Sequence, residues 1–464
     1  MSLKPPPAAF DAETQVLVVG AGAAGLIAAL SAREAGAEVV LIERDATPRG
    51  STALSAGLIP AAGTRFQAER GIADDAAAFA RDIDAKSHGE ADPDLVALVA
   101  REAGPTVEWL ADRYGLPFSV VHDFDYPGHG ARRMHGLPSR SGAELMDRLR
   151  AAVEGADATL LGGALAVALF VEPDGRLRGV EIERPDGSRE SIAARALVLA
   201  CNGYGGHPDL VARHIPEMAG ALYFGHPGNR GDALLWGEAL GAKLAHLSAY
   251  QGHGSVAHPH GVLITWATIS EGGFQVNASG ARFCDESRGY SEQAREVIAQ
   301  EGGLAWTIFD ERIAAIARQF EDYRQAEAAG AIAAAPDVEG LARALKLPAA
   351  RLGATHAEVE ALKRAGARDR FGRDFAGVPA LASPLRGVKV RGALFHTQGG
   401  LAVDSQARVQ RREGGVLPNL FAAGGAAAGV SGSSAQGYLS GNGLLTASTL
   451  GRIAGRSASR LALR

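Results

Sequence analysis

The sequence is poor in cysteine and has no long apolar run and no block of basic residues. Its 464 residues include two cysteines, Cys201 and Cys284, which supply no disulfide framework, metal site, haem-attachment pattern or iron–sulfur pattern and fit a reducing cytoplasm. The net charge of −5 argues against a nucleic-acid partner, and the short apolar runs argue against membrane insertion. Residues 1–12, rich in Pro and Ala, are predicted to be a flexible tail rather than a signal peptide.

Glycine, by contrast, is abundant, with 60 residues, many of them in turns that follow apolar strands. The most informative of these turns is Gly20-Ala-Gly-Ala-Ala-Gly25, which follows the apolar run ending at Val19. A small-residue helix and a second apolar strand come next, and that strand ends at Glu43. This order predicts a βαβ unit that binds a dinucleotide, with the pyrophosphate at the helix N-terminus and the ribose on Glu43.

Further strands and a change in texture indicate how the rest of the chain is organised. Strands are predicted over 164–170 and 177–183, and from Ala196 into a glycine turn at Gly203. Between about residues 252 and 396 the pattern becomes helical, notably over 311–335 and 338–367. These features predict an α/β protein that carries an inserted domain.

Three glycine turns together resemble one family of flavoproteins, which includes fumarate reductases, succinate dehydrogenase flavoproteins and 3-ketosteroid dehydrogenases. The turns are Gly20–Gly25, Leu199-Ala-Cys-Asn-Gly-Tyr-Gly205 and Ala422-Ala-Gly-Gly425. His396-Thr-Gln-Gly-Gly400 and the other motifs extend the likeness over nearly the whole chain. The resemblance implies a Rossmann-like FAD-binding domain of the glutathione-reductase type, formed by residues 13–251 and 397–464. It also implies an α+β capping domain over residues 252–396.

The same resemblance implies FAD as the cofactor and supplies its expected contacts. Some relatives bind the flavin covalently through a histidine, but the stretch 49–57 has none, so the FAD is expected to be non-covalent. At the position of Gly425 the family usually has a glutamate, which makes a hydrogen bond to the ribityl chain. Because this chain has glycine there, that hydrogen bond has to come from another group. The residues expected to bind FAD are Gly20, Gly22, Ala23, Ala24, Gly25, Glu43, Arg44, Ser51, Thr52, Ser55, Ala56, Gly57, Ala166, Ala200, Asn202, Gly203, Asp232, Gly425, Gly443 and Leu444.

The reacting face departs from that of the fumarate reductases. Dicarboxylate reduction needs cations for the carboxylates and a proton donor. The two family arginines fall on Tyr290 and Tyr438, and the proton-relay acid and arginine fall on Trp266 and Ile269. Arg288 could be a shifted substitute for one of the arginines.

The replacements are similar to the pattern of 3-ketosteroid 4-dehydrogenases, which have a Tyr-x-Ser-Gly stretch like the one at Tyr438 and Ser440. A phenol can transfer the α-proton while hydride passes between the β-carbon and flavin N5, and a second phenol can hold the enolate. His253 and His396 fall on substrate-binding positions of the family. The alternative for each tyrosine is a packing role. Tyr126 falls loosely on a further active-site tyrosine, with a loop aromatic as the default interpretation.

These observations predict an FAD-dependent oxidoreductase acting on CH–CH or C=C bonds next to a carbonyl. Its catalytic residues are predicted to be Tyr290, Tyr438, Ser440, His253 and His396, with a small-molecule substrate and a separate electron donor or acceptor. A fumarate- or tricarballylate-type enzyme using His253, His396 and Arg288 is the first alternative. A non-catalytic flavin-binding electron-transfer or sensor protein is the second.

Overall fold

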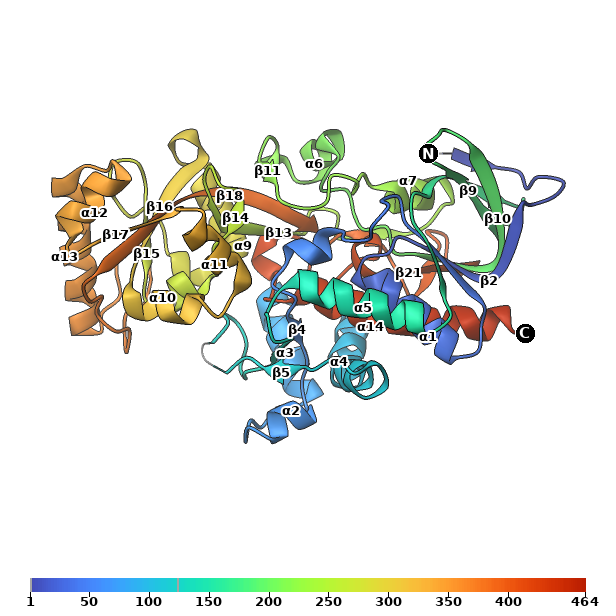
Figure 1. Cartoon of the computed structure of the whole chain (residues 1–464), viewed down its shortest axis with the longest axis horizontal. Coiled ribbons are helices and arrows are strands. Elements are labelled where there is room, and N and C mark those ends of the chain that lie inside the picture. Colours follow the sequence, from blue (N-terminus) through green and yellow to red (C-terminus); the bar gives the residue numbers. More distant parts are fainter. Residues whose placement is uncertain (1, 123–124) are drawn as a thin grey trace.

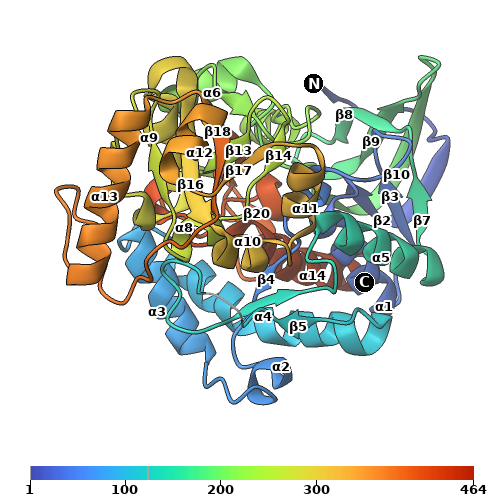
Figure 2. The same cartoon turned by 60° about the vertical axis from the view of Figure 1, so that its left-hand side comes forward.

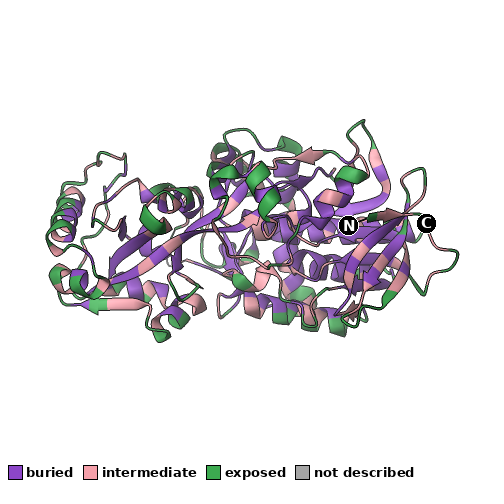
Figure 3. Ribbon diagram, turned by 90° about the horizontal axis from the view of Figure 1, so that it is seen from above, coloured by how far each residue is buried: buried purple, intermediate pink, exposed green. Residues whose placement is uncertain are grey.

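The computed structural model describes residues 2–122 and 125–464, which form two adjoining halves (Figure 1). The half on the right of Figure 1 contains both described chain ends and the largest sheet, and the half on the left is built from the middle of the sequence. In Figure 3 buried residues run through the centre of both halves, and exposed residues gather on the outer helices and turns.

The largest sheet forms the core of the nucleotide-binding half and has the strand order β1-β8-β9-β10-β2-β3-β7, with β21 on β10 and β20 on β21. Its central strands pair in parallel and are apolar because both faces are covered. The strands are β1 (Ser2–Lys4), β2 (Ala12–Val19), β3 (Val39–Ile42), β7 (Thr159–Leu161), β8 (Leu165–Val171), β9 (Leu177–Glu183), β10 (Arg189–Leu199), β20 (Arg408–Gln410) and β21 (Val416–Ala422).

Two helices pack against each other beside this sheet, α1 (Ala23–Glu34) and α14 (Asn442–Ala462). Glycines on α14 allow the close approach: a Cβ at Gly455 would lie 2.1 Å from the carbonyl oxygen of Ala28. The other helices of this half are α2 (Arg65–Ala68), α3 (Ala76–Ser87), α4 (Pro93–Tyr114), α5 (Gly142–Gly155), α6 (Pro208–His214) and α7 (Asp232–Ala239). Short strands complete it: β4 (Ile59–Pro60), β5 (Ser119–Val120), β6 (Met134–Gly136), β12 (Leu244–Ala245) and β19 (Gly400–Leu401).

The second half is a mixed sheet with helices around it, seen from another side in Figure 2. Its strand order is β14-β13-β18-β16-β15, and β11 and β17 also pair with β18. The strands are β11 (Leu222–Tyr223), β13 (Tyr250–Ala257), β14 (Val262–Leu263), β15 (Phe274–Val276), β16 (Leu304–Asp310), β17 (Ile332–Ala335) and β18 (Leu385–Thr397). The helices are α8 (Ala267–Ser270), α9 (Tyr290–Ile298), α10 (Glu311–Ala317), α11 (Glu321–Ala328), α12 (Val338–Leu345) and α13 (Ala349–Ala365).

Short 3-10 turns connect several of these elements. They are η1 (Ser51–Leu54), η2 (Pro216–Met218), η3 (Glu286–Arg288), η4 (Glu301–Gly303), η5 (Gly424–Ala426) and η6 (Ala435–Gly437). The strands β13 and β18 pair with each other and contain the predicted crossing residues 252 and 396. The division into a capping domain over 252–396 and an FAD-binding domain around it remains a prediction, whose boundaries fall inside two paired strands.

The start of the chain differs from the predicted flexible tail. Residues 2–4 form β1, which pairs in parallel with β8. The Lys4 ammonium lies 2.8 Å from the Glu181 carboxylate, and the Phe10 ring meets Phe170 edge-on with centroids 5.4 Å apart. Without β1, β8 would be the edge strand of the sheet, and the extended residues 2–4, which precede the prolines, add to that edge.

Two further findings concern a stretch predicted to be helical and the apolarity of the helices. The stretch 311–335, predicted to be helical, ends in β17, where the alanine-rich residues 332–335 pair with β18. Across the described residues, no helix combines the length and apolarity needed to cross a membrane.

Candidate active site

A single large cavity is lined by the dinucleotide-binding turn and by the second half of the molecule. We call one part the nucleotide end, lined by Gly20, Gly22, Ala24, Glu43, Arg44, Ser51, Thr52, Ala166, Ala200, Asn202 and Asp232. We call the other part the substrate end, lined by Phe224, His253, Leu263, Trp266, Tyr290, Phe320, Asp322, Phe395, His396 and Tyr438. Ser55, Ala56, Gly57, Gly425, Gly443 and Leu444 also line the cavity.

Four of the predicted site residues lie beside the cavity without lining it: Ala23, Gly25, Gly203 and Ser440. Gly25 faces the turn instead, because a Cβ there would lie 1.8 Å from the carbonyl oxygen of Gly20. Gly25 therefore allows the helix to pack closely on the turn. At Gly203 a Cβ would lie 2.0 Å from the Thr397 hydroxyl, so this glycine also serves backbone packing.

The nucleotide end is held together by hydrogen bonds around Glu43. One carboxylate oxygen of Glu43 accepts the Ala21 N–H at 2.8 Å, and the other accepts the Asp45 N–H at 3.2 Å. The Arg44 guanidinium donates to the Gly228 carbonyl at 3.0 Å. These bonds tie the end of β3 to the glycine turn and to the 226–229 loop.

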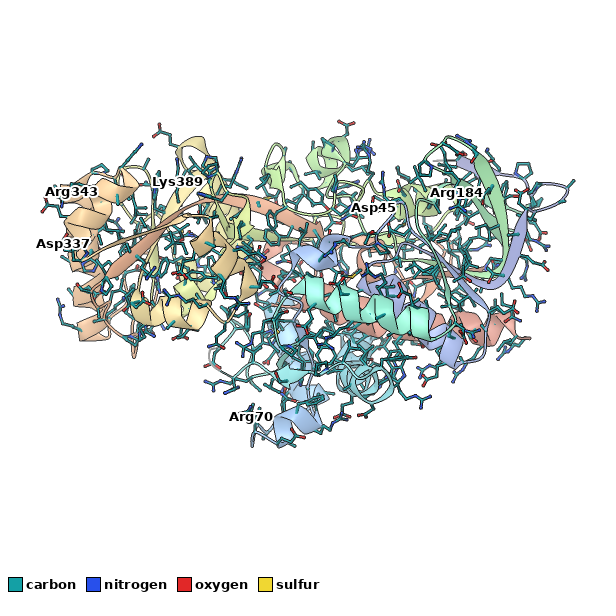
Figure 4. All side chains as sticks on the ribbon, in the orientation of Figure 1. Asp45, Arg70, Arg184, Asp337, Arg343 and Lys389 are labelled. Carbon is teal, nitrogen blue, oxygen red and sulfur yellow. The ribbon has the colours of Figure 1, made fainter. Side chains whose placement is uncertain are left out.

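The loop at 226–229 closes the nucleotide end from the other side. The Ser51 hydroxyl accepts hydrogen bonds from the His226 N–H at 3.0 Å and from the Asn229 carboxamide at 2.8 Å. His226 also lies 2.7 Å from Asp45, which Figure 4 labels in the nucleotide-binding half. The other residues labelled there, including Arg70, Arg184 and Arg343, lie at the periphery of the molecule.

Asn202 explains the glycine at position 425. A Cβ at Gly425 would lie 2.1 Å from the Asn202 side-chain oxygen, so this carboxamide occupies the space that a side chain at 425 would need. Asn202 lines the cavity with a positive φ of 66°, a conformation that asparagine tolerates. A polar group is therefore present where the family glutamate is missing.

At the substrate end, the four positions that depart from the fumarate reductase pattern come together. Trp266, Ile269, Tyr290 and Tyr438 form one buried cluster, although they are far apart in the sequence. Tyr290 is the first residue of α9, and its ring meets that of Tyr438 edge-on with centroids 6.0 Å apart. The described residues give the Trp266 indole N–H no hydrogen-bond partner.

Both phenols are protonated at neutral pH. Burial raises the pKa of Tyr290 to about 12, and the hydroxyls of Ser440 and Tyr438 partly oppose this effect. Burial raises the pKa of Tyr438 further, and the proximity of Tyr290 adds to the shift. The Tyr438 hydroxyl accepts the Gly443 N–H at 3.4 Å, at the N-terminus of α14. The two hydroxyls are therefore hydrogen-bond donors in the resting protein.

His253 lies between two aromatic rings. Its imidazole stacks on Tyr290 with centroids 4.8 Å apart and on Phe395 at 5.1 Å. Burial lowers the pKa of His253 to about 3, so the ring is neutral. Its Nδ1 accepts the Ser255 N–H at 3.1 Å, which leaves the proton on Nε2 as a donor.

His396 is oriented by a chain of hydrogen bonds that the sequence did not reveal. The Gln398 carboxamide donates to His396 Nδ1 at 3.1 Å, and its oxygen accepts the Ser431 hydroxyl at 2.9 Å. Asn442 in turn donates to the Ser431 oxygen at 2.9 Å. Burial lowers the pKa of His396 to about 4, so the ring is neutral. Its Nδ1 lies between the Gln398 donor and the Thr397 carbonyl oxygen, which is 3.3 Å away, and the proton is on Nε2 in the tautomer whose Nδ1 accepts from Gln398. A Cβ at Gly443 would lie 2.6 Å from this Nε2.

Arg288, considered as a shifted substitute for a family arginine, lies outside the cavity in this structure. The Arg288 side chain is 68% exposed, lies 3.7 Å from Asp285 and does not line the cavity. Among the described residues that line the cavity, the one arginine or lysine is Arg44, at the nucleotide end. The arginine of the 280–283 motif is buried in ion pairs with Glu286 and Asp369.

Several lining residues escaped the sequence analysis. Phe224 stacks on Phe395 with centroids 4.8 Å apart, and Phe320 and Asp322 come from the start of α11. Tyr126, interpreted by default as a loop aromatic, also lines the cavity. A single aromatic residue outside a motif could line a cavity or pack in the core, and the sequence does not distinguish these two positions. Only the loose family match pointed to Tyr126.

Comparison with known proteins identifies the family. A family model described as "FAD binding domain" matches residues 15–444. The chain belongs to this FAD-binding family. A probable fumarate reductase, Ifc3, of Shewanella frigidimarina is 31% identical over 97% of this chain and 75% of its own length. The protein is thus a flavoprotein oxidoreductase of the fumarate reductase type that acts on CH–CH bonds, with FAD as its cofactor.

Solved structures agree with this assignment. The open conformation of a flavocytochrome c3 fumarate reductase matches with a TM-score of 0.82 and 29% identity, over 98% of this chain and 80% of that one. A 3-ketosteroid-Δ4-(5α)-dehydrogenase from Rhodococcus jostii matches with a TM-score of 0.74 and 24% identity over 97% and 98%, a likeness in fold alone. The cavity suits FAD: its nucleotide end has a side-chain-free glycine turn at a helix N-terminus and the Glu43 carboxylate.

Proposed function

We propose that this flavoprotein reduces a carbon–carbon double bond conjugated to a ketone, and that the same site runs the reverse desaturation when an electron acceptor is present. The observation that carries the proposal is the cluster of two protonated phenols and a tryptophan at the substrate end. Reduced FAD supplies the hydride when it is bound, and the protein has to supply a proton and hold the carbonyl oxygen.

In this proposal Tyr290 is the proton donor. The Ser440 and Tyr438 hydroxyls and the Gly441 backbone lower its pKa relative to burial alone, so they favour the phenolate that forms when the proton leaves. Burial and the proximity of Tyr290 hold the pKa of Tyr438 well above its ordinary value, so Tyr438 stays protonated and acts as a hydrogen-bond donor. The reaction balances as one hydride to the β-carbon and one proton to the α-carbon.

The carbonyl oxygen needs neutral donors in a dry site. The Nε2–H group of His253 is available for this purpose, because its Nδ1 accepts the Ser255 N–H. His396 offers a second Nε2–H group in the tautomer whose Nδ1 accepts from Gln398. Both rings are neutral at pH 7. They therefore polarise a ketone without contributing the positive charge that a dicarboxylate would require.

We also propose that FAD is held non-covalently by the nucleotide end, with Glu43 at the ribose and Asn202 in place of the missing glutamate. Electrons are exchanged with a separate donor or acceptor. The proposal for Asn202 rests on the space that its carboxamide fills beside Gly425.

Dicarboxylate reduction is the second candidate, and the name of the Shewanella relative favours it. The absence of an arginine or lysine among the described residues lining the substrate end disfavours it.

An anaerobic assay separates these functions. The photoreduced holoenzyme is mixed with cyclohex-2-enone, a 4-en-3-one steroid, fumarate or tricarballylate, and the return of oxidised-flavin absorbance is followed. We expect reoxidation by the enones and none by the acids. Reoxidation by the acids alone would establish the dicarboxylate function, and no reoxidation by any compound would favour a non-catalytic flavin-binding role.

A further inference from the structure

Asp322 is an isolated acid in the wall of the substrate end. It lies in the first turn of α11, between Phe320, which lines the same cavity, and Tyr323, which is fully buried in the core of the second half. The neighbouring wall is apolar or aromatic, with Leu263 and Tyr126 among its residues. A carboxylate in such a wall loses part of its hydration, and no contact with the protein evidently compensates for that loss.

No hydrogen bond or ion pair within residues 2–122 and 125–464 engages the Asp322 carboxylate. Burial raises its pKa to about 7, with a small addition from Glu321, and no cation opposes the shift. The contrast with the other lining acids is clear. Glu43 accepts two backbone N–H groups. Burial raises the pKa of Asp232 as well, but Arg44 and Arg230 oppose that shift, whereas no cation does so at Asp322.

The charge balance of the cavity points in the same direction. Arg44 is the cation in the described lining, and its guanidinium is bonded at the nucleotide end. The described lining of the substrate end therefore has one acid and no arginine or lysine. The Arg140 guanidinium lies behind this lining, 5.8 Å from the centroid of the Phe320 ring. A ligand with a second carboxylate would meet repulsion there, whereas a hydroxyl or ammonium group would satisfy Asp322.

We propose that the Asp322 carboxylate binds a hydrogen-bond donor, a hydroxyl or ammonium group, that the substrate carries away from its reacting double bond. The proposal rests on the function proposed above, and it makes the substrate a hydroxy- or amino-substituted α,β-unsaturated ketone. Asp322 is outside the Trp266–Tyr438 cluster and comes from a different helix than Tyr290, so it contacts a different part of the same molecule.

Three steroids that share the 4-en-3-one group test this assignment. Testosterone has a hydroxyl donor at C17, 4-androstene-3,17-dione has a carbonyl acceptor there, and the 17β-amino analogue has an ammonium group. Dissociation constants for the oxidised holoenzyme are measured from the change in flavin absorbance at about pH 8.5, where a carboxyl group with a pKa of about 7 is ionised. Reoxidation rates are measured with the reduced enzyme at the same pH. We expect a preference of about tenfold or more for a donor probe over the dione, the size of a hydrogen bond to a charged group.

The variant Asp322→Asn should reduce this preference to within about twofold, because an amide binds donors and acceptors alike. Glu321→Gln is the matched control: it removes the adjacent carboxylate, which does not line the cavity, and should keep the preference. The two donor probes distinguish the hydroxyl from the ammonium. Should Asp322→Asn lose FAD, Asp322→Ser is used, and the wild-type preference alone still decides.

Equal binding of the donor and acceptor probes, or a preference that survives in Asp322→Asn, would overturn the proposal, as would the failure of every probe to bind. Cyclohex-2-enone separates this result from the proposed function. If the enzyme reduces cyclohex-2-enone but binds donor and acceptor steroids equally, the role of Asp322 is wrong and the proposed enone reduction still stands. If the enzyme prefers the donor steroids in binding but reduces no enone, the role of Asp322 is supported and the proposed enone reduction is wrong.

Discussion

The two ends of the cavity are built in different ways. The nucleotide end is made of glycine backbone, helix N-termini and short polar side chains from segments that are mostly close in sequence. The substrate end is made of large side chains from β13, α9, α11, β18 and the segment before α14. Backbone recognition is set by a local motif, whereas side-chain recognition depends on how distant elements meet. This difference explains how related proteins can share a cofactor and still act on different substrates.

The strongest way to test the comparison is to remove one hydroxyl from the substrate end. Tyr290→Phe should lower the rate of flavin reoxidation by an enone by about 10²–10⁴-fold, the usual contribution of a general acid. FAD content should stay at the wild-type level, because the nucleotide end is untouched. The measurement is anaerobic stopped-flow absorbance.

Tyr323→Phe is the matched control, because this tyrosine is buried in α11 and its hydroxyl has no hydrogen-bond partner among the described residues. Its rate should equal that of the wild type. Equal rates for Tyr290→Phe and the wild type would assign Tyr290 to packing.

The converse test adds one methyl group to the nucleotide end. In Gly25→Ala the new Cβ would lie 1.8 Å from the Gly20 carbonyl oxygen, and relief requires the turn to move. We expect a destabilisation of about 3 kcal/mol, at the upper end for overpacking, and loss of FAD from the purified protein. Gly353→Ala is the control, because no atom lies within 4 Å of its added Cβ and helix propensity favours alanine. Full FAD occupancy in Gly25→Ala would contradict the close packing of this turn.

The same difference explains what the sequence could predict. The order of the Gly20–Gly25 turn, a helix, a strand and Glu43 predicts a βαβ unit from the sequence alone. Each of these residue types is required by the backbone conformation at its own position. The family pattern also singled out Trp266, Ile269, Tyr290 and Tyr438, which do meet in one cluster. Asp322 and Phe224 lie in no local motif, and their position depends on where α11 and β18 pack. Gln398 lies inside the 396–400 motif, but its bond to the His396 ring could not be read from the motif. The edge pairing of β1 depends likewise on a strand more than 160 residues away.

The histidines of the substrate end predict a dependence of stability on pH. The pKa values of His253, about 3, and His396, about 4, are lower in the folded protein than the value of about 6.5 expected after unfolding. The unfolded chain therefore binds more protons below pH 6.5, so stability falls as the pH drops from 6.5 toward 4. Each residue should cost about 2 kcal/mol between pH 7.5 and pH 5.

Urea unfolding at the two pH values measures this loss. His253→Asn should flatten the slope, whereas His88→Asn, at an exposed left-handed helix end where asparagine is tolerated, should preserve it. An unchanged slope in His253→Asn would show that this ring is not the group responsible.

The smallest effect is expected from Gln398, which orients His396 and is not itself placed against the substrate. Gln398→Leu removes the donor to Nδ1 and leaves the Thr397 carbonyl oxygen as its neighbour, so the proton is drawn to Nδ1 and the Nε2–H donor is lost for part of the time. We expect kcat/KM for an enone to fall about tenfold, as is typical when the partner that fixes a functional histidine is lost. Ser431→Ala, one bond further along the chain, should have a smaller effect, because Gln398 keeps its bond to the ring. A fall in kcat/KM with FAD content unchanged, graded from Gln398 to Ser431, identifies orientation as the cause, whereas equal losses in both variants would indicate a general disturbance of packing.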